Sequence, residues 1–527
     1  MKYNGTSFGA KQSKDEKRLI KMRNEIEKDI LRLETRKSLA DWEFSTNSTE
    51  ENKKKFQREE KRVSNYYNNN GKIFSELSKF EKRDNIKMPK LIRQLYYLLG
   101  LFNLTENSDK KSMELNKLEN NIIKKRNSYQ IILNGKAVSE TEILHREQFE
   151  LNPKIRKQLY SARVNAGDAV ADDIIELIKK RNEFAQKKRF DDFFEYKYSQ
   201  YSDYSLENLN NWMREIYNSI NSQNLRFKEA EKQKQAEIFG ITPNEIREYH
   251  RKLILPNSSI QEVNKKIDSV ATIVEICKKA YKGMGFDIDT MPLILDLLPR
   301  HNKDTGNFCL NIAPGKDERI SANLTNDFSD MLTLMHELGH AVYDLNTGTK
   351  LNYMDKQPAA ILTEGFATMM EDTVFAENLT KDISDKNLSK DLKEYRIKEI
   401  MLNILRIEFE KSLYQNPNQD PEKLWHDLNV KYNCGSPNEP LSNYWATINH
   451  FNENPAYHTV YFLAELFKVQ LYNVLTQKFG PITQNSDVRN YLKRHFFKYG
   501  SSLPDNEIVK NATGKSLSPE DFIKSVQ

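Results

Sequence analysis

The stretch MLTLMHELGHAVYDLN, Met331 to Asn346, combines an apolar helical pattern with two of the chain's nine histidines. His336 and His340 are four residues apart, and Glu337 lies between them. Residues i and i+4 of an α-helix lie on one face, so both imidazoles can point at a single position. Glu337 is rotated by about 100° from His336, which places it beside that position. The pattern predicts a buried helix with a polar group on one side.

Two imidazoles on one helix face supply half of a zinc site. Catalytic zinc takes three protein ligands and leaves one position for water, whose proton Glu337 could accept. This HExxH spacing predicts one Zn²⁺ per chain, with His336 and His340 as ligands and Glu337 as general base. The alternative is a helix core in which other groups satisfy both histidines. The apolar neighbours weigh against it, because buried polar residues need a partner.

The third ligand must come from elsewhere in the chain. The pattern HExxHxxGxxH would need glycine at 343 and histidine at 346, where the chain has Tyr343 and Asn346, so that class is excluded. The segment PAAILTEGFATMMEDTVF follows, and its first acidic residue is Glu364, 24 residues after the second histidine. We predict Glu364 as the third ligand, with Glu371 or Asp372 supporting a ligand from behind.

A later segment, ATINHFNENPAYHTVYFLAEL, brings His450, His458 and Tyr461 together before an apolar run. Hydrolysis of an amide places negative charge on the carbonyl oxygen, and hydrogen-bond donors at that oxygen stabilise it. Each of the three residues alone is more often a packing residue. Their clustering in an Asn- and Pro-containing loop makes them candidates for this role.

The rest of the chain predicts a mostly helical fold. It has only 18 glycines and 16 prolines in 527 residues, and few interruptions favour long helices. Helical spacing of apolar residues is clear over 19–33, 172–186 and 459–475. Ser48 and Glu51 are spaced as a capping box that would begin a further helix.

Two short runs around Pro-Gly, in NFCLNIAPGKDERISANLT, predict a β-hairpin just before the histidine helix. The more charged first part of the chain and the part with the histidines suggest two helical lobes, 1–250 and 251–527.

Composition limits the possible partners. Hydrophobic residues make up 38% and charged residues 30%, which is typical of a folded globular protein, and no stretch is apolar enough to cross a membrane. The net charge of +6 comes from 81 basic and 75 acidic residues that are interleaved, so we expect no nucleic-acid partner. Three widely spaced cysteines and the lack of an apolar leader favour the cytoplasm, unless a leader has been removed.

These residues resemble the angiotensin-converting-enzyme family of zinc peptidyl-dipeptidases, which are gluzincins. That family also has HExxH followed 24 residues later by the ligand glutamate. Looser likeness extends from about Ile20 to the end, in SLADWEFSTNSTEEN, RNEFAQKKRFDDFFEYKYS, CLNIAPGKDERISANLTNDFSDMLTLMHELGH and ATGKSLSPEDFIKSV. The resemblance implies an all-α fold of two large helical halves that enclose a deep active-site channel. N-terminal helices would form its lid, and short strands would lie beside the zinc helix.

The resemblance also implies roles for the site residues. Glu337 would act as general base and then acid, and Tyr461 and His450 would stabilise the transition state. Short peptides would be the substrates, with release of C-terminal dipeptides as the default.

Several positions depart from the family. The histidine that follows Cys309 in the family is Leu310 here, and the aspartate four residues after the ligand glutamate is Thr368. A family lysine and tyrosine that hold the substrate's C-terminal carboxylate are Ile448 and His458, and a chloride-binding arginine is Val460. We therefore expect little chloride dependence.

Three hypotheses remain open from the sequence. The first is a peptidyl-dipeptidase, and the second is an oligopeptidase that cleaves internally because the carboxylate anchor has changed. The third is an inactive helical peptide-binding protein, which the intact HExxH motif and Glu364 disfavour. The sequence leaves the oligomeric state open.

Overall fold

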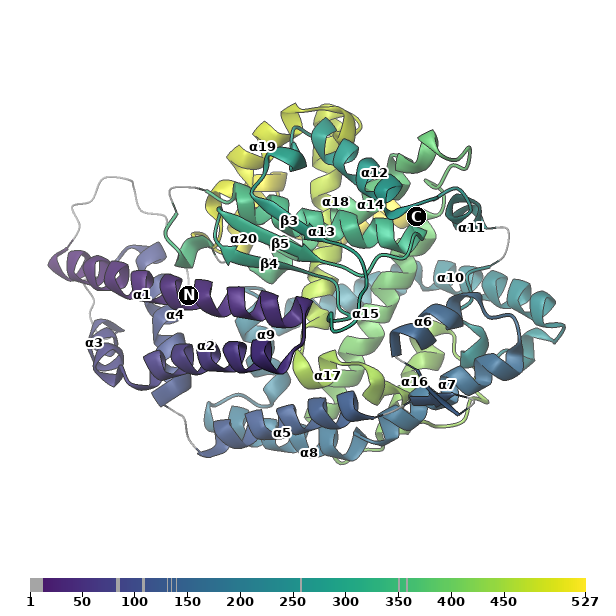
Figure 1. The fold of residues 1–527 in the computed structure, drawn as a ribbon, viewed down its shortest axis with the longest axis horizontal. Coiled ribbons are helices and arrows are strands. Elements are labelled where there is room, and N and C mark those ends of the chain that lie inside the picture. The colour runs from purple at the N-terminus through teal and green to yellow at the C-terminus, as the bar shows by residue number, and fades with distance from the viewer. Residues whose placement is uncertain are drawn as a thin grey trace.

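The computed structural model describes residues 13–81, 86–106, 110–129, 131–133, 135–138, 140–255, 258–348, 351–356 and 359–527. Helices dominate these residues, which confirms the expected fold class (Figure 1). The first half contains α1 Lys14–Thr46, α2 Glu50–Asn68, α3 Gly71–Glu81, α4 Pro89–Glu106, α5 Lys110–Ser128, α6 Glu140–Phe149, α7 Pro153–Asp168, α8 Ala171–Lys187, α9 Phe193–Tyr201 and α10 Leu206–Phe239. The second half contains α11 Ser259–Asn264, α12 Val270–Gly283, α13 Phe328–Asn346, α14 Ala360–Ala376, α15 Leu392–Gln415, α16 Pro421–Asn433, α17 His450–Glu453, α18 His458–Phe479, α19 Asp487–His495, α20 Asp505–Thr513 and α21 Glu520–Val526.

The three helices expected from apolar spacing are α1, α8 and α18. The start of α2 differs by one residue from the expectation. Thr49, not Ser48, caps it, and its side chain accepts a hydrogen bond from the backbone N–H of Asn52. The Ser48 hydroxyl instead donates to the carbonyl of Phe44, back in α1. Adjacent serine and threonine residues offer equivalent caps, so the sequence alone did not choose between them.

The expected hairpin is present as β4 Phe308–Ala313 and β5 Asp317–Ser321, which pair antiparallel. A third strand, β3 Leu293–Asp296, pairs parallel to β5 on its other side and was not expected from the sequence. The strand order is therefore β3-β5-β4, which leaves β4 at the edge. This sheet packs on α13, and β4 also contacts α1 (Figure 1). A separate small hairpin joins β1 Ile131–Leu133 to β2 Lys136–Val138.

Buried apolar residues form one large cluster and two small ones among the described residues. The large cluster runs from Leu115 to Val526 and includes the apolar faces of α13, α14, α15 and α18. A smaller cluster joins α1, α3 and α4 to Met354. A third is confined to Leu133, Ile143 and Leu159. The boundary expected near residue 250 stays a prediction, as does the channel between two halves.

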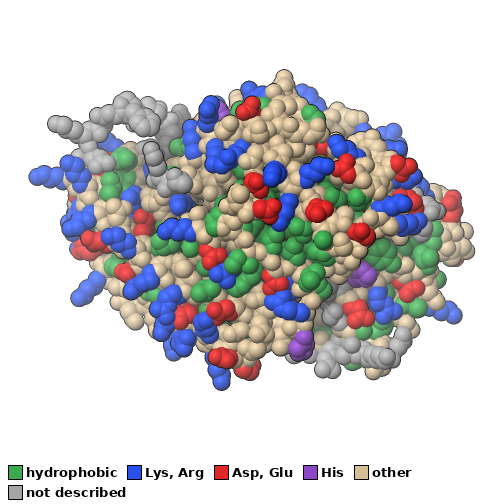
Figure 2. Space-filling model, turned by 45° about the horizontal axis from the view of Figure 1, so that its top comes forward, with side chains coloured by type: hydrophobic (Ala, Val, Ile, Leu, Met, Phe, Trp, Pro, Cys, Tyr) green, Lys and Arg blue, Asp and Glu red, His purple; other side chains and the backbone are tan. Residues whose placement is uncertain are grey.

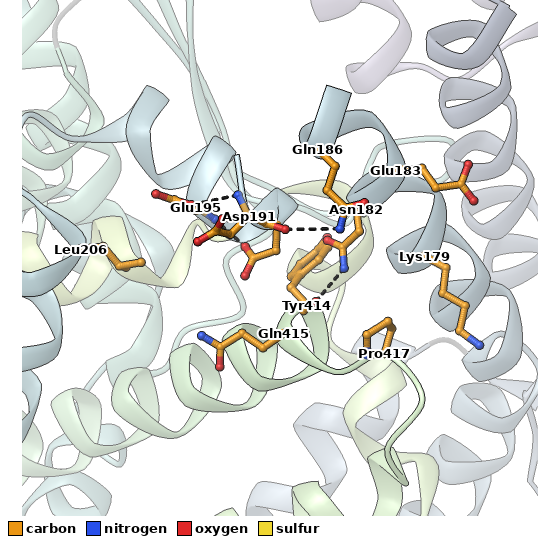
Figure 3. A pocket seen from close by; sticks show the side chains of 11 residues that line it. Lys179, Asn182, Glu183, Gln186, Asp191, Glu195, Leu206, Tyr414, Gln415 and Pro417 are labelled. Atoms are coloured by element: carbon orange, nitrogen blue, oxygen red, sulfur yellow. Dashed lines mark hydrogen bonds between the residues drawn. The ribbon is translucent and has the colours of Figure 1, made fainter. Parts of the chain in front are cut away.

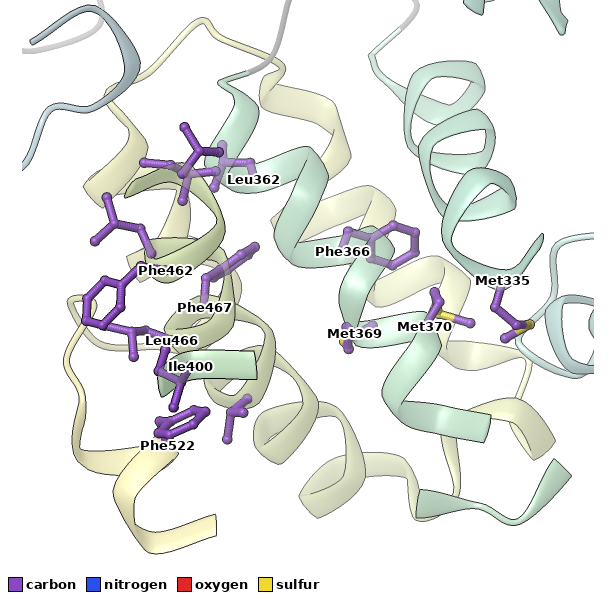
Figure 4. Packing of buried hydrophobic residues seen from close by; sticks show 14 of the residues in the cluster. Met335, Leu362, Phe366, Met369, Met370, Ile400, Phe462, Leu466, Phe467 and Phe522 are labelled. Atoms are coloured by element: carbon purple, nitrogen blue, oxygen red, sulfur yellow. The ribbon is translucent and has the colours of Figure 1, made fainter. Parts of the chain in front are cut away.

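The centre of the large cluster is a stack in which α14 packs against both α13 and α18 (Figure 4). Phe366, Met369 and Met370 of α14 and Leu466 and Phe467 of α18 are fully buried there. Tight packing of this kind holds side chains in fixed positions. The stack therefore fixes the relative positions of the polar residues that α13, α14 and α18 carry.

The surface mixes both signs of charge. Figure 2 shows Lys and Arg side chains interspersed with Asp and Glu over the face in view. Among the described residues, no helix is long and apolar enough to cross a membrane.

Candidate metal centre and neighbouring residues

Helix α13 presents both expected histidines on one side. It begins after Asp327, whose side chain accepts from the backbone N–H of Asp330 in a capping box. His336 and His340 lie one turn apart, and their Nε2 atoms are 3.0 Å from each other. Their side chains retain 20% and 19% of their exposure, so the otherwise buried helix face stays accessible at this point.

Gly339 brings α14 close to these histidines. A Cβ atom at Gly339 would lie 2.8 Å from the Cα atom of Ala367 in α14, a distance that real side chains do not reach. Helix α14 can therefore approach α13 only because residue 339 has no side chain. The close approach places Glu364 of α14 opposite the two imidazoles.

The three expected ligands converge. The Oε2 atom of Glu364 lies 3.5 Å from the Nε2 atom of His336 and 3.8 Å from that of His340. Ligands at about 2.0–2.1 Å from a tetrahedral zinc ion are separated by about 3.3–3.4 Å, so these spacings fit one ion. Moreover, the same Oε2 atom is buried and accepts no hydrogen bond from the described residues. A carboxylate oxygen in this state fits a cation as its missing partner.

Glu371 supports His336 from behind. Its Oε1 atom lies 2.6 Å from Nδ1 of His336, and its Oε2 atom accepts from the hydroxyl of Tyr395 at 2.8 Å. A hydrogen bond at Nδ1 leaves Nε2 to face the metal position. Burial lowers the pKa of His336, but the hydrogen bond to Glu371 and the charges of Glu371, Glu364 and Glu337 together outweigh it and raise that pKa to about 9.

Asp372, the alternative support, lies elsewhere. Its two oxygens accept from Nε of Arg396 at 2.8 Å and from Nζ of Lys468 at 3.0 Å. It therefore joins α14 to α15 and α18 in a buried ion network. Of the two acids weighed from the sequence, Glu371 is the one that touches a histidine of the metal centre.

Glu337 is 7% exposed and lies beside the three donors. Burial raises its pKa to about 7, although the charge of His336 and the backbone N–H of Cys309 oppose this shift. Cys309 belongs to β4, so the edge strand of the sheet positions the Glu337 carboxyl. A carboxyl group that accepts and releases a proton near neutral pH suits general acid–base chemistry.

His450 and Tyr461 are neighbours, as expected. The hydroxyl of Tyr461 lies 3.4 Å from Nε2 of His450. Burial, followed by the charge of Arg406, lowers the pKa of His450 to about 4, so the imidazole is neutral at pH 7. Burial also raises the pKa of Tyr461 well above its usual value, which keeps its hydroxyl protonated as a donor. His458 is buried behind them, with its ring 4.9 Å from that of His450.

Two residues of this site were missed from the sequence, Tyr457 and Tyr395. The Tyr457 hydroxyl donates to Oε1 of Glu364 at 3.0 Å, which leaves Oε2 directed at the histidines. Tyr457 lies between α17, which begins at His450, and α18, so its place in this segment was a usable signal. Tyr395 is separated from Glu371 by 24 residues and lies on another helix. Only the packing of α15 on α14 brings it near, and no spacing in the sequence shows this.

The chain also has cavities away from this centre. One of about 530 Å³ lies where α8, α9 and the end of α15 meet, with Asn182 and Tyr414 at its back (Figure 3). Its lining contains none of the residues predicted for the metal centre.

A helical scaffold that brings HExxH and a later glutamate to one point defines a zinc metallopeptidase of the gluzincin type. Comparison with known families agrees. The family model described as angiotensin-converting enzyme matches residues 13–224, and the one described as peptidase family M3 matches residues 291–527. Both are families of zinc gluzincins, so the chain is a zinc metallopeptidase of this type, with zinc as its cofactor and peptides as its substrates. A search of curated proteins found no match.

Proposed function

We propose that this metallopeptidase hydrolyses short peptides at a zinc ion held by His336, His340 and Glu364. The convergence of the three donor atoms, one of them a buried oxygen without a hydrogen-bond partner among the described residues, carries this proposal. A zinc ion in this place supplies Lewis acidity that activates water and polarises a peptide carbonyl.

The chain's own residues would handle the proton and the charge. Glu337 would take the proton of the attacking water and pass it to the leaving amine. The Tyr461 hydroxyl would donate to the carbonyl oxygen as negative charge develops there. His450, neutral and 3.4 Å from that hydroxyl, would orient it or donate beside it. Glu371 would hold His336 in the tautomer that binds the metal.

Release of C-terminal dipeptides is the mode we propose first, because the resemblance to angiotensin-converting enzyme implies it. Internal cleavage of oligopeptides is the second candidate, and a specific observation favours it. Ile448 and His458 replace the family's carboxylate-binding residues, and His458 is 1% exposed and so withdrawn from a substrate. The family model that matches the zinc-binding half is that of peptidase family M3.

A cytoplasmic location stays a prediction.

Zinc analysis combined with mass-spectrometric mapping of products from a mixed peptide library tests these proposals. We expect one zinc per chain and hydrolysis that a chelator abolishes. Products shorter than their substrates by two C-terminal residues would support dipeptide release, whereas fragments from internal bonds would support the second candidate. A zinc-loaded protein that leaves the whole library intact would overturn both and favour the inactive peptide-binding protein.

A further inference from the structure

A basic cavity of about 380 Å³ has Ile448, two residues before His450, in its lining. It lies where α6, α7, α10, α15, α16 and the short helix η6 Asn443–Thr447 meet. Six basic residues line it: Arg156, Arg163, Lys228, Arg251, Lys252 and Arg406. Only two acidic residues, Glu147 and Glu248, share the lining. The cavity therefore has a clear excess of positive charge.

Local acids satisfy part of this charge. Glu147 lies 3.1 Å from Lys252 and 3.6 Å from Arg163, and Glu248 pairs with Arg251 at 2.9 Å. One carboxylate, that of Glu147, thus lies beside two of the cations.

Two further basic residues show the excess directly. Arg156 is fully buried, donates to backbone carbonyls of Tyr249, Glu147 and Glu150, and keeps its Nη2 atom without a partner among the described residues. Burial, followed by the charge of Arg251, lowers the pKa of Lys228 to about 8 although Glu231 opposes it. Crowded cations of this kind are stabilised when an anion joins them.

Arg406 is the basic residue of this cavity whose charge acts on the candidate catalytic residues. It lies on α15 and is partly buried, and among the described residues it has no hydrogen bond or ion pair. Glu399 lies two turns earlier on α15. Its carboxylate interacts with Arg406 only through longer-range electrostatics. The charge of Arg406 in turn reaches His450 and Tyr461, where it adds to the lowered pKa of His450 and opposes the rise that burial gives the pKa of Tyr461.

One residue of the cavity lining is also close in sequence to the candidate catalytic residues. Ile448, which lines it, precedes His450 by two residues. An extended peptide advances about 3.3 Å per residue, so a peptide whose scissile carbonyl lies at Tyr461 would extend away from it by this step toward neighbouring subsites.

We propose that this cavity is a substrate subsite for a carboxylate, with Arg406 as its specificity-determining residue. The inference rests on the peptidase function proposed above and adds the class of substrate. The carboxylate has two possible sources, the C-terminus of the peptide or an acidic side chain near the cleaved bond. Arginine suits both, because its planar guanidinium binds a carboxylate through two hydrogen bonds.

The test uses the zinc-loaded full chain and three kinds of peptide of one length, the third kind being a series. The first is neutral and C-terminally amidated, the second has a free C-terminus, and the third is amidated with one glutamate moved through the positions that flank the cleaved bond. We compare kcat/KM for the native protein and for Arg406→Gln, Arg406→Lys and Arg214→Gln. Arg214 is exposed on α10 outside the cavity lining, so its variant matches the change in charge.

We expect the native protein to favour a carboxylate-bearing peptide by about ten- to a hundredfold, chiefly through KM. Arg406→Gln should bring this ratio close to one, Arg406→Lys should keep part of it, and Arg214→Gln should keep all of it. Preference for the second peptide identifies the C-terminus as the source, and preference for the third identifies acidic side chains. No preference in the native protein, or an unchanged ratio in Arg406→Gln, would overturn the inference.

Calorimetric binding separates this inference from the proposed function. If no peptide is hydrolysed in a chelator-sensitive way, the peptidase proposal fails, and the same peptides are then titrated into the native protein and Arg406→Gln. Tighter binding of a carboxylate-bearing peptide by at least about tenfold, lost in Arg406→Gln, would still support the subsite. Equal binding of all three peptides would refute it. Circular dichroism of each variant shows whether a loss reflects unfolding.

Discussion

At the scale of single residues, Glu337 differs from the other acids of the site in what surrounds it. Glu364 and Glu371 both accept a hydrogen bond from a tyrosine hydroxyl. Glu337 instead receives the backbone N–H of Cys309, and burial dominates its pKa. Its carboxyl is therefore held by a strand and not by another side chain, which leaves it free to exchange a proton with a water molecule.

Replacing Glu337 with glutamine should abolish proton transfer and leave the metal ligands in place. We expect Glu337→Gln to bind zinc as the native protein does, while kcat falls by about 100- to 10,000-fold. Metal analysis and steady-state kinetics on one preparation check both parts. Native-like kcat in the zinc-loaded variant would show that another group is the base.

The grouping of the proposed metal ligands could be predicted from the sequence because helix geometry fixes part of it. The four-residue spacing places His336 and His340 together whatever the rest of the fold does. Glu364 followed from its position early in the next helix. Asp372 and Glu371, by contrast, are adjacent in sequence and point to different neighbours, so only the packing of α15 and α18 distinguishes them.

At the scale of elements, the approach of α13 to α14 depends on Gly339. Gly339→Ala should force the helices apart, since the added Cβ would meet backbone 2.8 Å away in Ala367. We expect a loss of about 1–3 kcal/mol in the free energy of unfolding and weaker zinc binding. Urea denaturation and metal titration measure these effects. Gly306→Ala is the matched control, because its nearest neighbour is a side-chain oxygen of Asp304. Equal stability of both variants would contradict the close-packing account.

A second contact between elements positions the loop before α18. Glu410 of α15 accepts the backbone N–H of Ala456 at 2.9 Å, and Ala456 has a φ of 62°, in the left-handed region. Burial raises the pKa of Glu410 to about 8 in spite of this bond and the charge of Arg181. The folded protein thus binds this proton more tightly than the unfolded chain, where the carboxyl has a pKa near 4.5.

The sign of the pH dependence follows from that difference. The stability that Glu410 contributes is complete below pH 4.5 and is lost as pH rises toward 8. Glu410→Gln cannot ionise, so its stability relative to the native protein should improve by about 2–3 kcal/mol between pH 5.5 and pH 8.5. Chemical denaturation at both pH values measures this change. Glu408→Gln, a partly exposed position on the same helix, should show no such trend. If the difference in stability between Glu410→Gln and the native protein is the same at both pH values, the raised pKa of Glu410 is wrong.

At the scale of the whole molecule, the two largest clusters of buried apolar residues differ greatly in size. The core of α1, α3 and α4 is small, whereas the large core holds α13, α14, α15 and α18. Long helices and the hairpin followed from the sequence because their signals are local. The addition of β3 to that hairpin did not, since strand pairing between distant segments leaves no local pattern.

The difference in core size predicts unequal local stability. Segments with few buried contacts open at lower free energy than the global core. In native-state hydrogen exchange we expect amides of α3 and α4 to exchange well before those of α13, α14 and α18. This order would agree with N-terminal helices that open as a lid, as the resemblance implies. Equal protection in the two groups would show that the helices open only with the rest of the molecule.

The proposal as a whole depends on α14 completing a metal site that α13 begins. The most direct test is the zinc content of Glu364→Ala compared with the native protein and with Glu176→Ala, which removes an exposed acid from α8. We predict one zinc per chain in the native protein and in Glu176→Ala, and loss of nearly all zinc in Glu364→Ala, together with its peptidase activity. A Glu364→Ala protein that still carries one tightly bound zinc would contradict the proposed site.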